Sequence, residues 1–470
     1  MRRRIFVLVL CALAAHRAAA QNIDIESLAG LQFNFGNPGA RSLGMGGAFL
    51  GLADDASAVE ANPAGLTILR KMEISLEGRN FAEQQVFTTS GTFPDLNRTA
   101  FSHHSNAVEL TFASVVVPFR KFTLGAFFHE PLRNEGAGRD VEIEESFLVG
   151  SPTLTVPDFY LPRDGGGPVS KQECEAIRNT AKDPFACLRG PLFPFVSAVE
   201  VQERTFGLAG AYQFGNFSVG ATARYQRFRE TAFTFRLDNS FTRLQSVIVQ
   251  ATSDIRERNQ RAEYVSDLTF GAGIKWTPTN SISLGAVYKQ GAEFPAPWFA
   301  ANADTNFEFV KGADSKFHIP DVFGVGLSVR PIPVLTVNAD VVRVTYSNLT
   351  DDFVSMNQAL RNLGSPYRTR DATEVHIGAE YFFSTKVPVA IRAGAWRDPA
   401  HSMEFHGPMN VGDVQARAEA VAAAILFPAG ETRNHISIGA GLAWPRFQID
   451  AAYDRSERFR VGSISAVTRF

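Results

Sequence analysis

The sequence has little cysteine, no strong charge of one sign and, after its first residues, no long hydrophobic run. Only 3 of the 470 residues are Cys, and the formal net charge is −2. A charge this close to zero gives no indication of a nucleic-acid partner. A membrane-spanning helix needs about 20 consecutive apolar residues, and no stretch beyond position 20 approaches that length. A helical membrane anchor beyond position 20 is therefore excluded.

Phenylalanine and glycine are abundant instead. The chain contains 40 Phe and 38 Gly. A secreted chain without a helical anchor can still enter a membrane if its strands close into a barrel, because every backbone group then pairs with a neighbouring strand. If the chain is such a barrel, its sequence should show strands with alternating apolar and polar residues.

The first twenty residues are typical of a secretory signal peptide. Three arginines at positions 2–4 precede an apolar run over 5–15, and small residues end at Ala20. We expect cleavage before Gln21, since the run is too short to span a membrane. A lipoprotein signal at Cys11 is disfavoured because bulky Leu10 stands where that signal needs a small residue.

Residues 39–67 are rich in Gly and Ala. Five glycines lie between Gly39 and Gly51. Glycine lets a backbone turn tightly and approach a wall that a larger side chain would hold off. We therefore expect residues 21–70 to form a compact plug in the lumen of a barrel that spans 71–470. Gly44-Met45-Gly46 begins like a dinucleotide fingerprint, but no strand precedes it and no βαβ unit follows.

Most of the remaining chain alternates between apolar and polar residues. Over 217–226 and again over 268–276, one set of alternate positions is apolar and the other is small or polar. Two faces of opposite polarity are typical of a β-strand. One phase slip occurs at Val341-Val342, where a β-bulge would turn Arg343 inward.

Fourteen segments carry this pattern, which predicts an all-β, antiparallel transmembrane barrel of about fourteen strands with an N-terminal plug. An even number returns the C-terminus to the side of the N-terminus. A hidden pair in the long insertion at 131–198 would raise the number to sixteen. The expected strand cores are 72–82, 107–117, 122–130, 199–214, 217–235, 260–276, 281–290, 317–330, 334–346, 372–383, 388–396, 433–443, 446–454 and 460–470.

Three features favour a membrane barrel over a soluble sandwich. Short connections alternate with mostly long ones, as expected of periplasmic turns and external loops. The final strand ends in Phe470, the terminal aromatic residue typical of outer-membrane barrels. Aromatic residues also stand at the ends of apolar faces, where a girdle meets the lipid headgroups. These residues are Tyr225, Trp276, Tyr288, Tyr381, Trp444 and Tyr453.

Several segments resemble the FadL-type long-chain fatty acid transporters, a family that includes uptake channels for aromatic hydrocarbons. Asn62-Pro63-Ala64 within EANPAGLT resembles the hatch of that family, and residues 319–353 resemble its later strands. The segments VHIGAEYFF and AIRAGAWRDPAH do so too. A group of secretion-associated barrels shares a similar Gly-rich start containing Asn-Pro-Ala.

The resemblance implies a monomeric, plugged barrel that transports hydrophobic small molecules, most simply long-chain fatty acids. An external site would capture the ligand, an internal pocket would hold it, and movement of the hatch would release it. The implied partners are the ligand, outer-membrane lipids with lipopolysaccharide, and the barrel-assembly machinery acting on Phe470. No cofactor, metal or nucleic acid is implied.

Apolar residues in the expected external loops are candidates for ligand capture, because exposed clusters of this size usually have a role. Packing among themselves or against lipopolysaccharide is the alternative. Residues 418–427 are apolar enough for a short helix over the barrel mouth. Phe33 and Phe35 would either gate the pocket or fill it. The capture candidates are Leu192, Phe193, Phe195, Phe294, Trp298 and Phe299.

Cys174 and Cys187 are the only cysteines left after cleavage. They follow Ser170-Lys171-Gln172-Glu173, which matches a helix capping box. An even pair in an oxidising compartment predicts a disulfide, which would stabilise so short a loop by roughly 3 kcal/mol.

No enzyme motif withstands inspection. His103-His104 lacks a carboxylate or Cys partner at ligand spacing. Glu374, His376 and Glu380 share a lumen-facing side, but a barrel lumen needs charged lining, and Arg343, Arg392 and Asp340 offer structural partners. No Ser-His-Asp arrangement can be assembled from spacing. We therefore expect a protein without catalytic residues.

Two further functions stay open. A general diffusion porin would have an open polar lumen, which the plug over 21–70 contradicts. A secretion-associated or structural barrel would hold partners on its surface, and co-purification of secretion components would favour it.

Overall fold

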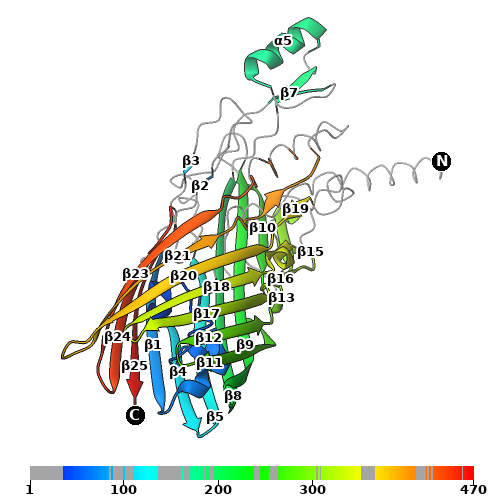
Figure 1. The fold of residues 1–470 in the computed structure, drawn as a ribbon. Coiled ribbons are helices and arrows are strands. Elements are labelled where there is room, and N and C mark those ends of the chain that lie inside the picture. The colour runs from blue at the N-terminus through cyan, green and yellow to red at the C-terminus, as the bar shows by residue number, and fades with distance from the viewer. Residues whose placement is uncertain are drawn as a thin grey trace.

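Figure 1 shows a computed structural model of the chain, in which long antiparallel strands form a barrel. The structure describes residues 35–83, 86–87, 99–100, 109–135, 160–163, 169–183, 186–189, 195–237, 244–252, 262–302, 305–306, 308–350, 366–408, 420, 423–424, 427–457 and 459–470. The predicted signal segment at 1–20 lies outside these residues.

Fourteen strands form a closed antiparallel barrel, which confirms the predicted fold class and strand number. The first strand, β1, pairs with β4 on one side and with the last strand, β25, on the other, so the sheet has no free edge. The barrel strands are β1 (Glu73–Glu83), β4 (Glu109–Phe119), β5 (Phe122–Glu135), β8 (Phe195–Phe214), β9 (Phe217–Leu237), β11 (Val265–Thr279), β12 (Ile282–Lys289), β17 (Val322–Ile332), β18 (Leu335–Val344), β20 (Ala372–Phe383), β21 (Val389–Asp398), β23 (Arg433–Ala443), β24 (Phe447–Arg455) and β25 (Phe459–Arg469).

Shorter strands lie in the longer connections between the barrel strands. Three of them extend the main sheet: β10 (Leu244–Ala251) pairs with β9 and with β14 (Trp298–Asn302), which pairs with β15 (Val310–Ala313). Four small two-stranded sheets are β2 (Val86–Phe87) with β3 (Thr99–Ala100), β6 (Tyr160–Pro162) with β7 (Cys187–Arg189), β13 (Glu293–Pro295) with β16 (Lys316–His318), and β19 (Tyr367–Arg368) with β22 (Glu404–Phe405). The 3-10 helix η4 (Tyr346–Thr350) follows β18.

The described part of the long insertion adds no further strand to the barrel, because β5 pairs directly with β8. Its two described strands, β6 and β7, pair only with each other in the sheet topology, beside helix α5 (Lys171–Ala181). These elements stand above the barrel in Figure 1. The alternative number of sixteen strands is therefore wrong.

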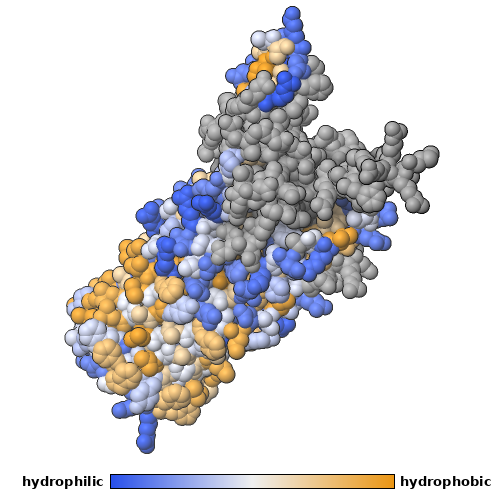
Figure 2. Space-filling view, turned by 90° about the vertical axis from the view of Figure 1, so that its right-hand side faces the viewer, coloured by the Kyte–Doolittle hydropathy of each residue, from blue (hydrophilic) through white to orange (hydrophobic). Residues whose placement is uncertain are grey.

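The outer surface of the barrel is apolar in a broad band. Along β11, Leu268, Phe270 and Ile274 are more than half exposed, while the alternating residues between them point inward. Figure 2 shows hydrophobic residues over the lower part of the molecule and hydrophilic residues above them. An apolar band this large is stable only against lipid.

Aromatic residues border this band as predicted. Tyr225, Trp276, Tyr381 and Tyr453 are each at least 40% exposed on the outer surface. Trp276 stacks on Phe217 with ring centroids 5.6 Å apart. These amphipathic rings suit the boundary between hydrocarbon and headgroups. Among the described residues, no helix is long and apolar enough to cross a membrane.

The predicted bulge at Val341-Val342 is wrong. Strand β18 pairs with β20 in unbroken register from Leu335 to Val344. Val341 faces outward and is 43% exposed, whereas Val342 lines an internal cavity. Arg343 therefore points outward and pairs with Asp371 at 2.9 Å. The two adjacent valines are both apolar because one meets lipid and the other lines the cavity.

Residues 40–69 fill much of the barrel lumen and form the plug. They contain helix α2 (Ala40–Gly44), helix α3 (Ala58–Ala61) and the 3-10 helix η2 (Pro63–Ile68). Helix α2 contacts β21, β23, β24 and β25, and η2 contacts β4, β5, β8, β9 and β11. The plug thus touches opposite parts of the wall, and its apolar residues join a core with Phe112, Val116 and Phe127.

Candidate functional site

Asn62 connects two parts of the plug to the barrel. Its Oδ1 accepts a hydrogen bond from Ala64 N at 3.2 Å and so caps η2. Its Nδ2 donates to Leu50 O at 3.0 Å and to Ile274 O on β11 at 3.2 Å. Pro63 occupies the first position of η2, where its missing N–H leaves no bond unmade. Asn62 is fully buried, so each bond is protected from water.

The wall beneath this turn is made of glycine. A Cβ on Gly220 would lie 2.4 Å from the carbonyl carbon of Pro63, and one on Gly273 would lie 2.3 Å from Asn62 Oδ1. These two glycines pair across β9 and β11. A Cβ on Gly285 would lie 2.1 Å from Leu50 O. The plug backbone therefore reaches the wall only because these positions carry no side chain.

A second set of glycines meets the other side of the plug. A Cβ on Gly378 of β20 would lie 2.2 Å from Met45 O, and one on Gly394 of β21 would lie 2.2 Å from Gly46 N. Gly46 and Gly47 have φ angles of +65° and +77°, which side chains rarely allow. The loop after α2 consequently lies directly on the wall.

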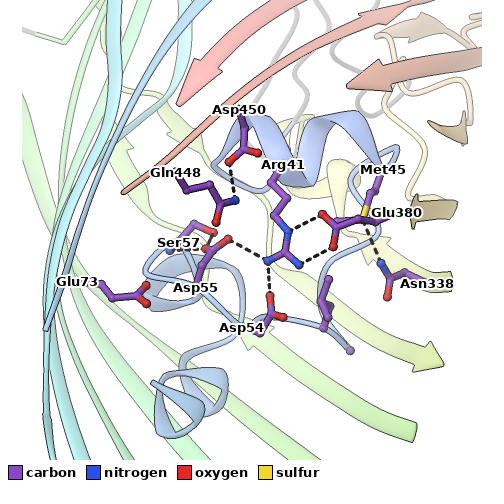
Figure 3. A network of polar contacts seen from close by, with 12 residues as sticks. Arg41, Met45, Asp54, Asp55, Ser57, Glu73, Asn338, Glu380, Gln448 and Asp450 are labelled. Carbon is purple, nitrogen blue, oxygen red and sulfur yellow. Dashed lines mark hydrogen bonds and ion pairs between the residues drawn. The ribbon is translucent and has the colours of Figure 1, made fainter. Parts of the chain in front are cut away.

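Arg41 is the centre of a buried charge cluster on α2 (Figure 3). Its guanidinium donates to both carboxylate oxygens of Glu380, at 2.9 and 2.7 Å, and contacts Asp54 at 2.5 Å and Asp55 at 3.5 Å. Burial alone would lower the pKa of Arg41, but the charges of Asp54 and Glu380 raise it well above its usual value. The cluster ties the plug to β20 by bidentate hydrogen bonds, the strongest kind that side chains form.

The cluster continues into the barrel wall. Arg392 of β21 contacts Glu380 at 2.6 Å and Asp450 of β24 at 2.8 Å. Gln448 donates to Asp450 at 2.8 Å. These residues lie near the short turns of the barrel, so the charges gather on that side of the plug.

The segment between the two helices is held by its backbone. Asp340 of β18 accepts hydrogen bonds from Phe49 N at 2.6 Å and Leu50 N at 2.8 Å. Lys275 of β11 donates to Gly51 O at 2.8 Å and also contacts Leu52 O. These bonds satisfy backbone groups that a buried loop cannot pair with water.

On the other side of the plug, toward the long loops, a cavity lies between the plug and the wall. The room that it offers to the centre of a water-sized molecule is about 80 Å³, and the cavity is partly open to solvent. Plug residues 35–50 form one side and eight barrel strands form the other. The apolar lining consists of Phe35, Leu43, Leu50, Phe81, Val287, Val322, Val342, Trp396, Phe459 and Val461. Asn37, Arg79, Lys289, Glu374, His376 and Asp454 supply the polar lining, with Gly36, Gly46 and Gly47.

The charged lining residues already have partners. Arg79 pairs with Glu77 at 2.6 Å and donates to Asn37 O at 2.7 Å. Lys289 pairs with Glu60 of the plug at 3.1 Å. Burial alone would raise the pKa of Glu60, but the charges of Lys289 and Arg224 lower it. These cations therefore compensate acids of the protein itself.

Histidine–carboxylate pairs and aromatic rings line the remaining wall. His376 contacts Glu374 at 3.1 Å and stacks on Trp396 with centroids 5.1 Å apart. The other face of Trp396 stacks on His435, which bonds Asp454 at 2.9 Å. The indole N–H of Trp396 also donates to Asp454, at 3.2 Å.

Phe35 lies at the edge of this arrangement. Its ring stacks on Tyr346 with centroids 6.3 Å apart, and Tyr346 stacks on His401 at 4.0 Å. Burial alone would lower the pKa of His401, but the hydrogen bond and charge of Asp398 raise it. Phe35 thus lines the cavity, whereas Phe33 lies outside the described residues.

The predicted exposure of three capture candidates is wrong. Phe294 is fully buried, and Trp298 and Phe299 are 6% and 4% exposed. The loop folds back as β13 and β14, and Phe294 stacks on Phe228 at 4.8 Å. These side chains form a small core at the barrel rim rather than a surface.

Of the other predicted positions, one is the exposed last residue, and the rest lie wholly or partly outside the described residues. Phe195 is the first residue of β8, and its side chain is not described. Phe470 is 63% exposed, and its backbone N–H bonds Met72 O. Leu192, Phe193, His103, His104 and most of residues 418–427 lie outside the described residues.

The predicted disulfide and capping box are both present above the barrel. Cys174 and Cys187 are joined, with an S–S distance of 2.06 Å. Ser170 Oγ accepts from Glu173 N, and the Glu173 carboxylate accepts from Ser170 N at 2.8 Å. Two hydrogen bonds from Ser170 lower the pKa of Glu173.

Sequence reasoning missed the aromatic wall of the cavity. Trp396 stands at a lumen-facing position of β21, after Arg392 and Gly394 on the same side. A large aromatic residue among small and charged inward positions was the available signal. Glu374, His376 and Glu380 do face the lumen, and Glu380 pairs with Arg392, but Arg343 does not reach them. Across the described residues, no group of three or more His, Cys, Asp or Glu could hold a metal ion.

Solved structures share this architecture over nearly the whole chain. A monoaromatic hydrocarbon channel, CymD, is 16% identical with a TM-score of 0.55, covering 93% of this chain and 99% of its own. A Pseudomonas aeruginosa FadL homologue is 15% identical with a TM-score of 0.54, covering 94% and 100%. The P. putida toluene transporter TodX is 14% identical with a TM-score of 0.53, covering 93% and 99%.

No protein-family model and no curated protein sequence matches the chain. Identities this low establish the fold alone, and that fold is the FadL-type plugged barrel that the sequence predicts. With its apolar band and aromatic border, the chain is a β-barrel of the bacterial outer membrane.

Proposed function

We propose that this barrel carries hydrophobic small molecules across the outer membrane and holds them in the cavity beside the plug. The observation that carries the proposal is the cavity itself, whose lining combines ten apolar side chains with charged groups that already have partners. Pockets for small apolar ligands are concave and mostly apolar, with a few polar groups. Structures of similar fold are named as a monoaromatic hydrocarbon channel and a toluene transporter, which supports the same class of ligand.

The lining favours an uncharged ligand over the fatty acids that the sequence suggests. A fatty acid carboxylate would need a cation, and the cations of the cavity contact Glu77, Glu60 and Glu374. Taking one of these cations would leave a buried carboxylate without its partner, which costs several kcal/mol. A hydrocarbon requires no such exchange, because it gains free energy simply by leaving water.

The route follows from the position of the cavity. It lies on the long-loop side of the plug, which we assign to the cell exterior. The plug closes the lumen toward the short turns, so a water-filled path of the porin type is not the proposed mechanism. Release then requires the plug to move, as the hatch of this fold class implies.

Binding measurements test both the function and the ligand class. Purified barrel in detergent is titrated with alkylbenzenes of increasing chain length and with saturated fatty acids of about eight to fourteen carbons, and displacement of a fluorescent apolar probe is followed. We expect affinity for alkylbenzenes to rise by up to about fourfold per methylene until the cavity is filled. Fatty acids should bind more weakly at pH 8 than alkylbenzenes of similar apolar area.

Two variants locate the binding site. Val342→Trp places a large ring in the cavity and should abolish binding. Val341→Trp changes the neighbouring residue of the same strand, which faces lipid, and should leave binding unchanged. Fatty acids that bind more tightly than alkylbenzenes would restore the fatty-acid assignment. If neither class binds, and secretion components co-purify with the barrel, the secretion-associated alternative is favoured.

A further inference from the structure

His376 joins the barrel to the floor of the cavity through both of its ring nitrogens. Nδ1 lies 2.7 Å from Gly46 O of the plug, and Nε2 lies 3.1 Å from a carboxylate oxygen of Glu374. A backbone carbonyl can only accept a hydrogen bond, so Nδ1 must carry a proton. Nε2 must carry one as well if Glu374 is ionised. Facing an ionised Glu374, His376 makes both contacts only as the imidazolium.

The Glu374 side chain has two hydrogen-bond partners among the described residues, of which His376 is one. Tyr346 of η4 also hydrogen-bonds the Glu374 side chain. A carboxylate can accept both of these hydrogen bonds at once, because its two oxygens offer about four lone-pair sites. A second acid, Asp340, stands directly opposite His376 on the neighbouring strand. The imidazolium is thus placed between two carboxylates of the wall.

The other described neighbours of His376 bring no competing positive charge into contact with it. Trp396 covers one face of the ring from β21. Behind Trp396, His435 is bonded to Asp454, both on the wall. From the plug, Gly46 and Gly47 approach with backbone only, and a Cβ on Gly47 would lie 3.1 Å from Nδ1.

The plug loop that His376 holds is also the part that shapes the cavity. Gly46, Gly47 and Leu50 line it. The next anchor along the loop is Asp340, which accepts from Phe49 N and Leu50 N. One wall group that donates and one that accepts therefore fix the two ends of residues 46–50.

We propose that His376 is a proton-operated contact, which holds plug residues 46–50 on the wall when it is protonated and frees the Gly46 carbonyl when it loses that proton. Neutral imidazole has only one N–H, and an ionised Glu374 holds it in preference to the uncharged Gly46 carbonyl, because a hydrogen bond to a charged acceptor is stronger. Docking of the loop and protonation of His376 thus favour each other, and rising pH loosens the cavity floor. The inference rests on the proposed function only in taking this cavity as the ligand site.

Hydrogen exchange tests the contact between His376 and Gly46 without any ligand. Exchange of plug segment 43–52 is followed by mass spectrometry in the purified full-length barrel between pH 5.5 and pH 8.5, with correction for the intrinsic pH dependence of exchange. We expect protection of this segment to fall by about tenfold at the higher pH, the loss of one charge-assisted hydrogen bond. Segment 58–68, which His376 does not contact, should keep its protection.

Three variants separate this contact from other titrating groups. His376→Gln retains an N–H donor but no titratable proton, and should remove the pH dependence. His376→Phe lacks a donor and should show low protection at both pH values. His435→Gln alters a buried histidine whose Nδ1 bonds the barrel residue Asp454, and should keep the pH dependence. Titration of Asp340 would act in the opposite direction, because protonation at low pH makes its carboxyl a weaker acceptor for Phe49 N and Leu50 N.

The inference is overturned if wild-type protection does not change with pH, or if the change persists in His376→Gln. Alkylbenzene binding, measured in the same samples, tests the proposed function separately. A barrel that binds alkylbenzenes but shows no pH-dependent exchange retains the function and loses the proton-operated contact. A barrel that shows the pH-dependent exchange but binds no apolar ligand retains the proton-operated contact and loses the proposed function.

Discussion

The two ends of the plug are fixed to the barrel by different chemistry. At the α2 end, Arg41 and its acidic partners form a charge cluster that runs into three strands of the wall. At the η2 end, Pro63 lies on the backbone at Gly220 and Gly273, and close packing replaces charge. The first end depends on electrostatic compensation in a water-poor interior, and the second depends on the absence of side chains.

This difference determines how each end fails. Removing one member of a buried charge cluster leaves the others uncompensated, which is more costly than the cluster is favourable. Adding atoms to a close contact forces the two backbones apart, and the cost depends on how far they can yield. Between these ends lies the loop at 46–50, whose anchors His376 and Asp340 are single side chains. We therefore expect the cavity floor to be the most easily moved part of the plug.

The largest effect is expected from Arg41→Ala. The change leaves Glu380, Asp54 and Asp55 without their shared cation, although Arg392 remains beside Glu380. Such losses destabilise by about 3–5 kcal/mol. Because the barrel itself is held by its closed sheet, the plug should lose protection while the barrel stays folded. Limited proteolysis of the plug, together with the heat-modified mobility of the barrel on a gel, measures the two effects separately.

Arg330→Ala is the matched control for this cluster. Arg330 contacts the same Asp54 at 3.2 Å, but its side chain is 42% exposed. An exposed pair contributes at most about 1 kcal/mol. Proteolysis of the plug should therefore change little in Arg330→Ala. Equal sensitivity of the two variants would show that burial does not govern this end of the plug.

The barrel strands were predictable because their pattern is local. In residues 433–443 every second side chain meets lipid and the others meet the lumen. Neighbouring residues therefore alternate in polarity, and the sequence shows that alternation directly. The predicted range of that strand coincides with β23. The compact plug was also accessible, because five glycines within thirteen residues are hard to place elsewhere.

The contacts of the site were not predictable in the same way. Arg41 is 339 positions from Glu380, and no local pattern connects them. The two adjacent valines at 341 and 342 suggested a bulge, since an apolar lumen-facing residue was not expected without knowledge of the cavity. Phe294 looked exposed because its burial depends on the pairing of β13 with β16 and on Phe228 of β9, and no local pattern shows these contacts. Side-chain partners depend on the closed barrel, which a strand pattern does not specify.

An intermediate effect is expected from Gly220→Val, which tests the close-packed end. The new Cβ would lie 2.4 Å from the carbonyl carbon of Pro63. Because that atom belongs to the backbone, no side-chain rotation can relieve the overlap. Overpacking of this kind typically costs about 1–3 kcal/mol. We expect the η2 segment to lose hydrogen-exchange protection, with less change at α2. Ligand binding should weaken less than protection of η2, because plug residues 35–50 line the cavity and η2 does not.

The same substitution at Gly462 provides the control. Gly462 is a strand glycine of β25, and no described atom lies within 4 Å of the place that a Cβ would occupy there. Gly462→Val should leave protection of the plug unchanged. If both glycine variants behave alike, the effect at position 220 comes from strand propensity rather than from contact with the plug.

The smallest effect is expected from replacing Asn62 and Pro63 together by Ala. The double change removes the cap of η2 and both donors to Leu50 O and Ile274 O, but it introduces no overlap and no charge. Loss of a cap costs about 1 kcal/mol, and the space left by the shortened side chain can admit a water molecule that donates to the two carbonyls in place of Asn62. We expect a folded, heat-resistant barrel with a net loss of about 1–2 kcal/mol in the plug. Uptake of hydrophobic ligand by cells should fall because the plug no longer holds one arrangement.

Asn62→Asp separates the cap from the two donor bonds in this turn. Aspartate keeps an acceptor for Ala64 N, so the cap survives, but a carboxylate faces the carbonyl oxygens of Leu50 and Ile274 instead of donating to them. If the donors matter more than the cap, Asn62→Asp should be at least as damaging as Asn62→Ala in hydrogen exchange of residues 49–52. Retention of wild-type protection in Asn62→Asp would assign the role of this asparagine to the cap alone. Wild-type uptake in the double variant would remove the turn from the transport mechanism.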